Sequence, residues 1–324
     1  GLRSSKLAMC RCLKIWVLGL AALAQLACPS KLFVTVDPDA PSSEILQHII
    51  TVFGIDAKCS SNSFDAMKES GFIIANHQLY SDWIYLFIFL AHLNRAQYLK
   101  FVLRRDIQFM PLVGLAMKLL GFIFVHRNWA LDESKFRRRI GRLETDNVPH
   151  NLIIFPEGTT LNPGAKVKSS AYAKEHGLPQ LDHVLLPRST GLLAALESQE
   201  PSDSKGILDL TMGYTEMPPD VVPERYFTLK GLFGLGHGPP QVHIHCSYVP
   251  INKIPIDDRE AFTRWLAGRF SAKDILLKEF FKEGRFNGHS TSVPSRLYPN
   301  GSFVSFWIQI SIMVFIPCFL IFYR

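Results

Sequence analysis

Short apolar runs alternate with helical patterns along residues 71 to 250, and this alternation restricts the fold more than any other feature of the chain. Runs of four to six apolar residues between polar or turn-forming residues are typical of buried strands. Strands that alternate with helices predict an α/β fold, here a mixed central sheet flanked by helices. The predicted strands are "GFIIAN", "GFIFVHR", "NLIIFPEG", "HVLLPRS", "ILDLTMGY" and "QVHIHCSYVP".

Both ends of the chain carry long apolar runs. The run "FVSFWIQISIMVFIPCFLIFY" (303–323) is uncharged and long enough to cross about 30 Å of hydrocarbon, so we predict a C-terminal transmembrane helix. Pro317 would kink it, and an interfacial segment is the alternative. The run "IWVLGLAALAQLA" (15–27) is shorter and follows Lys14. A signal sequence, a shortened span and a monotopic anchor all fit it, and we favour an N-terminal hydrophobic anchor.

These patterns divide the chain into five predicted parts. Polar stretches rich in Ser and Pro predict loops before the core. In residues 257–286, Phe262, Leu266 and Phe270 recur at helical spacing together with Trp265, which predicts a helix with one buried face. The predicted parts are an anchor (1–30), a loop-rich lead-in (31–70), a core domain (71–250), an amphipathic helical extension (251–290) and a transmembrane helix (303–323).

The charge of the chain limits the classes of binding partner, and its cysteine content indicates the redox compartment. The net charge is +7 and the pI is about 9.1, but the basic residues do not form a long tract interleaved with aromatics, so we expect no nucleic-acid partner. The densest cluster, "KFRRRIGR" (135–142), suits anionic lipid head groups or a phosphorylated substrate, with a solvated helix face as the alternative. Six cysteines without a CxxC pair predict free thiols in a reducing compartment.

The run "IIANHQLYSDW" (73–83) places a histidine and an aspartate where a strand is expected to end and a helix to begin. A separation of five residues puts His77 and Asp82 on opposite faces of a strand and about 140° apart on a helix, so a turn must bring them together. With Ser81 as the helix N-cap, Asp82 can hold Nδ1–H of His77 and leave Nε2 as a general base. The chain has no G-x-S-x-G motif, so the activated hydroxyl is expected to belong to the substrate.

Two further groups of polar residues follow predicted strands. Arg127 ends the run "GFIFVHR" and can bind phosphate through two parallel hydrogen bonds, or can form an ordinary salt bridge, for instance to Glu157. The stretch "FPEGTTLNPG" combines a flexible glycine with hydroxyl groups, and its backbone N–H groups can hold a phosphate or polar head group. Its polar and flexible residues are Glu157, Gly158, Thr159 and Thr160.

Together these blocks resemble the glycerolipid acyltransferases, the family of lysophosphatidic acid and lysophospholipid acyltransferases. "NHQLYSD" is similar to the family's NHx4D block, "GFIFVHR" to the second block, "FPEGTT" to the third and "LLPRSTG" to the fourth, in the family's order. "FRRRIGRL" and "WLAGRFSAKDILLKEFFKEGRF" resemble the branch of lysocardiolipin and lysophosphatidylinositol acyltransferases and their fungal relatives. The resemblance covers most of residues 70–290 and implies that residues 71–250 are an acyltransferase catalytic domain.

The resemblance implies transfer of a fatty acyl group from acyl-CoA to the free glycerol hydroxyl of a lysophospholipid, such as lysophosphatidylinositol. His77 and Asp82 are the implied catalytic pair, and Glu157 is expected to orient Arg127 or a hydroxyl because a carboxylate repels phosphate. We expect no cofactor and no metal, since acyl-CoA is a co-substrate. The residues implied to hold the acceptor phosphate or to shape the acyl-CoA side are Arg127, Glu157, Gly158, Thr159 and Pro187.

Some residues depart from the family pattern or suggest other sites. Thr160 stands where many members have arginine, which removes a phosphate-binding charge and agrees with the branch that takes bulkier head groups. His126 lies on the opposite strand face from Arg127, so a structural role is expected. His243 and His245 share one face of a predicted strand, but Cys246 points the other way, and sheet packing is expected instead of a metal site.

The apolar runs also suggest where the chain works. Lysolipids and acyl-CoA gather at the bilayer surface, so the runs at 84–93 and 110–120 are expected to line an acyl tunnel or to enter the leaflet. The expected location is the endoplasmic reticulum membrane, with mitochondria and lipid droplets as alternatives. Alternative functions are acylation of lysophosphatidic acid, transacylation between phospholipids, and a non-catalytic lipid-binding scaffold.

Overall fold

The central sheet contains eight strands in the order β4-β3-β5-β2-β6-β7-β1-β8 within the described part of the chain. The computed structural model describes residues 2–36, 49, 71–109, 113–145, 150–198, 206–218 and 221–293. Strands β4, β3, β5, β2 and β6 run parallel, β7 is antiparallel to β6, β1 is parallel to β7, and β8 is antiparallel to β1. The sheet is therefore mixed, as predicted. The strands are β1 (Lys31–Val36), β2 (Gly71–Ala75), β3 (Leu99–Arg104), β4 (Ile123–Val125), β5 (Asn151–Ile154), β6 (Gly206–Tyr214), β7 (Gln241–Pro250) and β8 (His289–Val293).

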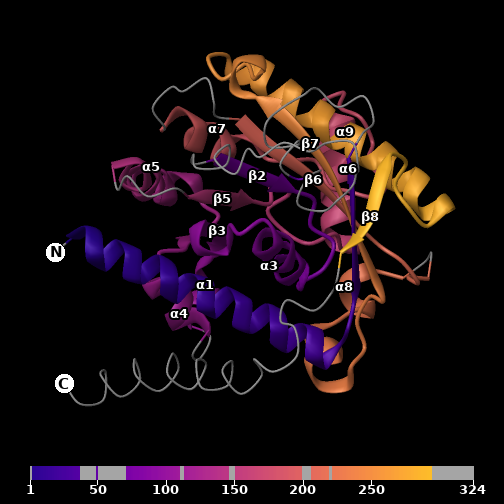
Figure 1. Cartoon of the computed structure of the whole chain (residues 1–324). Helices are drawn as coiled ribbons and strands as arrows, with labels where there is room; N and C mark the ends of the chain where they lie inside the picture. Colours follow the sequence, from indigo (N-terminus) through magenta and orange to yellow (C-terminus); the bar gives the residue numbers. More distant parts are fainter. Residues whose placement is uncertain are drawn as a thin grey trace.

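Helices cover both faces of this sheet and form two separate cores. On one face α1, α3 and α4 pack over an aromatic cluster that includes Phe87, Phe101 and Phe122. On the other face α5, α7 and α9 bury apolar side chains such as Phe136 and Phe262, and Figure 1 shows α3 and α9 on opposite sides of the strands. The helices are α1 (Leu2–Ala27), α3 (Asp82–His92), α4 (Val113–Leu119), α5 (Trp129–Thr145), α6 (Pro163–Glu175), α7 (Ser189–Glu197), α8 (Pro223–Tyr226) and α9 (Arg259–Glu283), with the short turns η1 (Ala96–Tyr98), η2 (Arg105–Phe109), η3 (Gly231–Leu235) and η4 (Ile251–Lys253).

The structure corrects several predicted elements. "HVLLPRS" is not a strand: residues 181–188 lie outside the sheet, as an irregular segment before α7. Residues 31–36, predicted as part of a loop-rich lead-in, form β1, which inserts between β7 and β8. The strands β3 and β8 were also not predicted. The sequence of β8, "HSTSV", has no apolar alternation because it forms a largely exposed edge strand, and only Val293 in it is buried.

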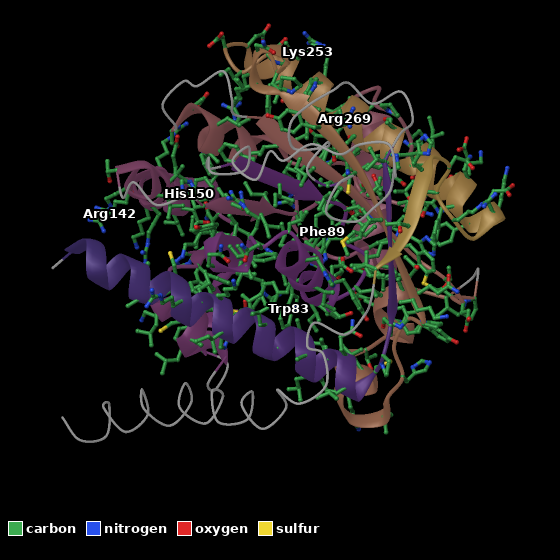
Figure 2. The ribbon with its side chains drawn as sticks, viewed as in Figure 1. Trp83, Phe89, Arg142, His150, Lys253 and Arg269 are labelled. Atoms are coloured by element: carbon green, nitrogen blue, oxygen red, sulfur yellow. The ribbon has the colours of Figure 1, made fainter. Side chains whose placement is uncertain are left out.

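The apolar helices α1 and α3 differ in how much of their surface is buried in the protein. α3 is a core helix, because Ile84 through Leu90 are all buried, and Figure 2 shows Phe89 in the interior. On α1, residues 8–27 are long and apolar enough to cross a membrane, although a third of that stretch is buried against the rest of the chain. Its buried side chains are Leu13, Val17, Ala21 and Ala24, at helical spacing. The predicted transmembrane helix at 303–323 lies outside the described residues.

The charged cluster at residues 135–142 lies on α5, where it has two roles. Arg137 donates to Glu133 (3.0 Å) and to Glu197 of α7 (2.8 Å), so it ties the two helices together. Arg142 and its basic neighbours are exposed, and Figure 2 places Arg142 at the periphery of the fold. The basic cluster at residues 135–142 therefore contains both a structural ion pair, made by Arg137, and a solvated basic face.

The parallel strands determine where a site can form. The carboxyl ends of parallel strands meet at one edge of a sheet, and connecting loops at that edge commonly carry binding and catalytic residues. Here the last residues of β2, β3, β4, β5 and β6 all lie at this edge. The strand ends that meet there are Ala75, Arg104, Val125, Ile154 and Tyr214.

Candidate active site

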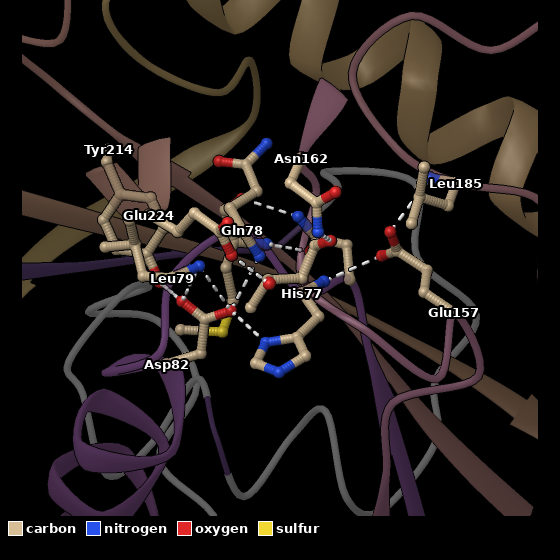
Figure 3. A network of polar contacts seen from close by, with 12 residues as sticks. His77, Gln78, Leu79, Asp82, Glu157, Asn162, Leu185, Tyr214 and Glu224 are labelled. Atoms are coloured by element: carbon tan, nitrogen blue, oxygen red, sulfur yellow. Dashed lines mark hydrogen bonds and ion pairs between the residues drawn. The ribbon is translucent and has the colours of Figure 1, made fainter. Parts of the chain in front are cut away.

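A tight turn after β2 brings His77 and Asp82 together, as the sequence predicted. Nδ1 of His77 lies 2.9 Å from Oδ2 of Asp82 (Figure 3). Asp82 is the first residue of α3 and is fully buried, whereas the His77 side chain keeps 18% of its surface exposed. Ser81 takes the N-cap position, but its side chain makes no capping hydrogen bond. The predicted side-chain cap by Ser81 is therefore not formed, and the carboxyl group of Asp82 is directed at the preceding turn instead of at the N–H groups of α3.

The carboxyl group of Asp82 is held in place by further donors. The backbone N–H groups of Gln78 (2.8 Å) and Leu79 (3.1 Å) donate to it, which fixes the turn that carries His77. The hydroxyl of Tyr214, at the end of β6, donates a short hydrogen bond to Oδ1. Burial and the nearby Asp82 raise the pKa of Tyr214 well above its usual value, so Tyr214 remains a donor at neutral pH. Sequence reasoning missed Tyr214, although its place at the end of a predicted strand was a usable signal.

The imidazole and the turn that carries it are fixed from two sides. The ring of His77 stacks on Phe155 with 4.3 Å between ring centroids. Asn76, which is fully buried, pairs its side-chain amide with both backbone groups of Met212 on β6 (2.7 and 3.0 Å). The two residues that follow β2 therefore have different roles, because Asn76 anchors the turn to the sheet and His77 presents its ring.

Glu157 lies below this turn and is buried. Its Oε1 accepts from the backbone N–H of His77 (2.7 Å) and its Oε2 from that of Leu185 (2.9 Å). Burial raises the pKa of Glu157 to about 8, although the two N–H donors act in the opposite direction. The expected contact with Arg127 is not among the hydrogen bonds of the described residues. Glu157 thus joins the turn that carries His77 to the 181–188 segment.

Three arginines gather beside the turn, at the ends of β3 and β4 and before α7. The pKa of Arg127 is lowered by burial and then by the positive charges of Arg104 and Arg188, so these guanidinium groups lie near enough to repel one another. Arg127 has a left-handed backbone (φ 63°), and Asp132 of α5 accepts from the N–H groups on either side of it (2.9 and 3.2 Å). Clustered guanidinium groups at a strand edge can bind an anion such as phosphate. Arg104 and Arg188 were not among the predicted site residues.

The remaining predicted site residues surround this cluster. Gly158 has φ 72°, a conformation that favours glycine, and a side chain there would approach Arg188. Thr159 and Pro187 are half-buried. The hydroxyl of Thr160 donates a short hydrogen bond to Glu224 of α8. Thr160 therefore serves to attach α8 to the loop after β5.

A cavity of about 690 Å³ opens behind the turn, on the side of Gln78. The cavity adjoins the turn that carries His77, because Leu161 in its lining donates its backbone N–H to the carbonyl of His77 (2.8 Å). A space of this size matches sites for small molecules. Its lining residues include Gln78, Leu161, Asn162, His183, Met217 and Phe281.

Two other histidines considered from the sequence, His126 and His243, have surface or packing contacts. The His126 ring lies 3.1 Å from the guanidinium of Arg105. His243 stacks on Phe33 with 4.6 Å between centroids, and burial lowers its pKa to about 4. Among the described residues, no group of three or more His, Cys, Asp or Glu side chains is arranged to hold a metal ion.

Comparison with known proteins gives the family. Residues 56–213 match the family model described as Acyltransferase, and residues 235–307 match Acyltransferase C-terminus. An uncharacterized acyltransferase of Saccharomyces cerevisiae is 32% identical over 303 residues, which are 86% of this chain and 72% of the relative. The chain belongs to this acyltransferase family. The resemblance predicted from the four sequence blocks is therefore confirmed.

Other relatives of this acyltransferase carry substrate names. A 2-acyl-1-lysophosphatidylinositol acyltransferase of Saccharomyces cerevisiae is 29% identical over 68% of this chain and 64% of the relative. Lysocardiolipin acyltransferase 1 of Mus musculus is 31% identical over 76% of this chain and 64% of the relative. The chain thus spans slightly less than two thirds of these two proteins. A crystal structure of the LPA acyltransferase PlsC from Thermotoga maritima aligns with a TM-score of 0.41 at 14% identity, over 72% of this chain and 79% of that one, a likeness too low to bear on the site.

Proposed function

We propose that this acyltransferase moves a fatty acyl group from acyl-CoA to the free glycerol hydroxyl of a lysophospholipid, with lysophosphatidylinositol or a similar lipid as acceptor. The observation that carries the proposal is the 2.9 Å contact between Nδ1 of His77 and Asp82, beside a cluster of three arginines. The names of the lysophosphatidylinositol and lysocardiolipin relatives support a lysophospholipid acceptor.

His77 acts as the general base in this proposal. With Nδ1–H held by Asp82, Nε2 takes the proton of the glycerol hydroxyl as its oxygen attacks the thioester carbonyl. The carbon–sulfur bond then breaks, and the imidazolium returns the proton to the leaving CoA thiolate. Asp82 stabilises the imidazolium between these two steps. The reaction needs no cofactor.

Arg127, with Arg104 beside it, binds the phosphate of the acceptor. Arg127 and Arg104 follow the ends of the neighbouring parallel strands β4 and β3, and because Arg104 is already paired with Asp106, the attraction for an anionic head group comes chiefly from Arg127. Gly158 and Thr159 leave room for the phosphate beside them, while Pro187 and Arg188 shape the acyl-CoA side. Glu157 acts indirectly, by holding the backbone of His77.

The reaction takes place at a membrane surface, because both substrates are amphiphiles and pulling an acyl chain through water costs about 0.8 kcal/mol per CH₂ group. The apolar stretch of α1 is suited to such a surface. The endoplasmic reticulum membrane is the proposed location, and residues 303–323 the proposed second anchor.

Acyl transfer by the purified protein in detergent tests the proposal. Labelled oleoyl-CoA is offered with a panel of lysophospholipids that includes lysophosphatidic acid, using wild type, His77→Ala and His176→Ala, a change of an exposed histidine on the surface of the fold. We expect transfer to one or a few head groups, a loss of at least about 100-fold in His77→Ala, and a normal rate in the control. A folded wild type that transfers to none of the acceptors, or a fully active His77→Ala, refutes the proposal.

A further inference from the structure

The 181–188 segment is held mainly by side chains from other elements. It lies outside the sheet, so its backbone N–H groups need partners elsewhere. The backbone N–H groups of Asp182 and His183 donate to Oδ1 of Asp274 (2.9 and 2.6 Å). The N–H groups of Leu185, Leu186 and Arg188 donate to the Glu157 carboxyl group (2.9 Å), the Ser169 hydroxyl (2.9 Å) and the carbonyl of Pro156 (2.8 Å).

Asp274 has an unusual place among these partners, because a single oxygen of its side chain accepts two consecutive backbone N–H groups. It lies on α9, which is firmly attached to the sheet. Phe270 and Leu277 on the same helix are fully buried, and the neighbouring Lys273 forms a buried ion pair with Asp209 of β6. Asp274 is therefore held in a defined position by α9, and it supplies acceptors to a segment that makes no sheet hydrogen bonds.

The 181–188 segment touches the catalytic turn at two places. The carbonyl of His183 accepts from the side-chain amide of Gln78 (3.2 Å), and the N–H of Leu185 shares the Glu157 carboxyl group with the N–H of His77. The segment ends at Pro187 and Arg188, and Arg188 lies beside Gly158 and near Arg127. A shift of this segment would therefore move the proposed acyl-CoA side of the site directly.

This contact joins the two regions that the family models match separately. The catalytic turn and the 181–188 segment lie within residues 56–213, whereas Asp274 lies within the C-terminal region, 235–307. The C-terminal region is thus connected by hydrogen bonds to the active-site backbone, in addition to its packing on the sheet.

We propose that Asp274 is a positioning residue for acyl-CoA, acting through the backbone of the 181–188 segment. The inference rests on the proposed function for its kinetic consequence, and on geometry alone for the restraint of the segment. Because both hydrogen bonds end on one oxygen, we expect the position of that oxygen to matter more than its negative charge.

Three substitutions separate position from charge. Asp274→Asn keeps an acceptor oxygen at the same place without the charge, Asp274→Glu keeps the charge but moves the oxygens by one methylene, and Asp274→Ala removes both. Glu279→Ala, at an exposed carboxylate further along α9, is the matched control. For each protein, KM and kcat are measured for acyl-CoA and for lysolipid, and hydrogen exchange is followed in peptides covering residues 178–188 and 259–268.

We expect the KM for acyl-CoA to rise in the order wild type, Asn, Glu, Ala, reaching about tenfold in Asp274→Ala with a smaller change in the KM for lysolipid. Exchange in residues 178–188 should become about tenfold faster in Asp274→Ala and stay slow in Asp274→Asn, with residues 259–268 unchanged. Unchanged exchange in Asp274→Ala overturns the restraint whether or not the protein is active. Faster exchange with an unchanged KM, or Asp274→Glu performing better than Asp274→Asn, overturns the positioning role. A wild type that transfers nothing refutes the proposed function and leaves the exchange result as the test of the restraint.

Discussion

At the scale of single residues, the site depends on groups that never reach a substrate. Asp82 collects two backbone N–H groups and the Tyr214 hydroxyl in addition to His77, so its orientation is determined before any ligand binds. Preorganised contacts of this kind matter because reorientation during the reaction would cost activation free energy. Tyr214 is the most informative of them, since its ring is buried and its hydroxyl can be removed alone.

Tyr214→Phe should lower kcat about tenfold and leave the KM for both substrates nearly unchanged, because one hydrogen bond to Asp82 is lost and no substrate contact is involved. Steady-state kinetics measure this effect. Tyr85→Phe is the control: this buried tyrosine lies with its ring 5.9 Å from that of Tyr214. A normal kcat in Tyr214→Phe, or an equal loss in Tyr85→Phe, would contradict the assigned role.

Glu157 makes stability depend on pH. Its carboxyl group keeps a proton up to about pH 8 in the folded protein, whereas the ordinary value is 4.5. Between these two values the folded state binds more protons than the unfolded state, so the free energy of unfolding falls as pH rises, by roughly 1.4 kcal/mol per unit from this group. This contribution is fully present below pH 4.5 and is lost by about pH 8.

The test for Glu157 is chemical denaturation at pH 5, 6, 7 and 8 in wild type and Glu157→Gln. The variant should be less stable at pH 5, because an amide offers only one acceptor to the N–H groups of His77 and Leu185. It should also show a flatter dependence on pH, since the titrating group is gone. Parallel curves for the two proteins would mean that Glu157 does not titrate in this range.

At the scale of elements, the sequence predicted the strands and helices that follow from a local apolar pattern. It missed the segments whose structure depends on partners distant in the chain. The strands around β2 and β5 and the helix α9 follow apolar periodicity and were predicted. The 181–188 segment has the composition of a strand, but its N–H groups go to Asp274, Glu157 and Ser169, which no local pattern indicates. β1 was missed because its partners β7 and β8 are also distant in the chain, with Lys31 opposite Gln241 and Leu32 opposite Val293.

The same division applies to the site. The contact between His77 and Asp82 follows from a turn of fixed length between a strand and a helix, so spacing was sufficient to predict it. Tyr214 and Asp274 come from elements that reach the site only through sheet order and helix packing. Glu157 was expected to orient Arg127 or a hydroxyl, but its contact with Leu185, like that of Thr160 with Glu224, could not be predicted because these partners are distant in sequence.

The attachment of α9 to the sheet gives a prediction at this scale. Asp209 on β6 pairs with both Lys273 and Arg269 of α9, and Asp209 and Lys273 are almost fully buried. Asp209→Ala should lower the free energy of unfolding by about 3–5 kcal/mol, because it leaves the buried ammonium group of Lys273 without its carboxylate partner. Denaturant unfolding in detergent measures this loss.

Two further variants test the cause of that loss. Glu260→Ala breaks an exposed pair with Arg264 on the same helix and should change stability by less than about 1 kcal/mol. The double change Asp209→Leu with Lys273→Met should recover part of the loss, since it replaces the buried ion pair with apolar groups. A double variant less stable than Asp209→Ala would show that the charges themselves are needed.

At the scale of the whole molecule, the two halves of the sheet have different roles. The parallel half carries the site at its carboxyl edge, and the mixed half, formed by β7, β1 and β8, joins the two ends of the described chain. Through β1 the helix α1 is attached to the central sheet, and its inner face forms part of the core over α3. α1 therefore has a structural face and, on the other side, residues such as Leu26 that are open to the surroundings.

A pair of substitutions on α1 separates these two faces. Val17 is fully buried, so Val17→Asp places an unpaired carboxyl group in the core and should unfold the protein or lower its stability by several kcal/mol. Leu26 is 55% exposed, so Leu26→Asp should leave stability within about 0.5 kcal/mol of wild type. If the open face of α1 meets a bilayer, Leu26→Asp should bind phospholipid vesicles about tenfold more weakly, because it replaces an apolar side chain with a charge. Denaturant unfolding and vesicle co-sedimentation measure these two effects. A Val17→Asp variant as stable as wild type would show that α1 is not part of the core. A Leu26→Asp variant that binds vesicles as well as wild type would mean that another part of the chain provides the membrane contact.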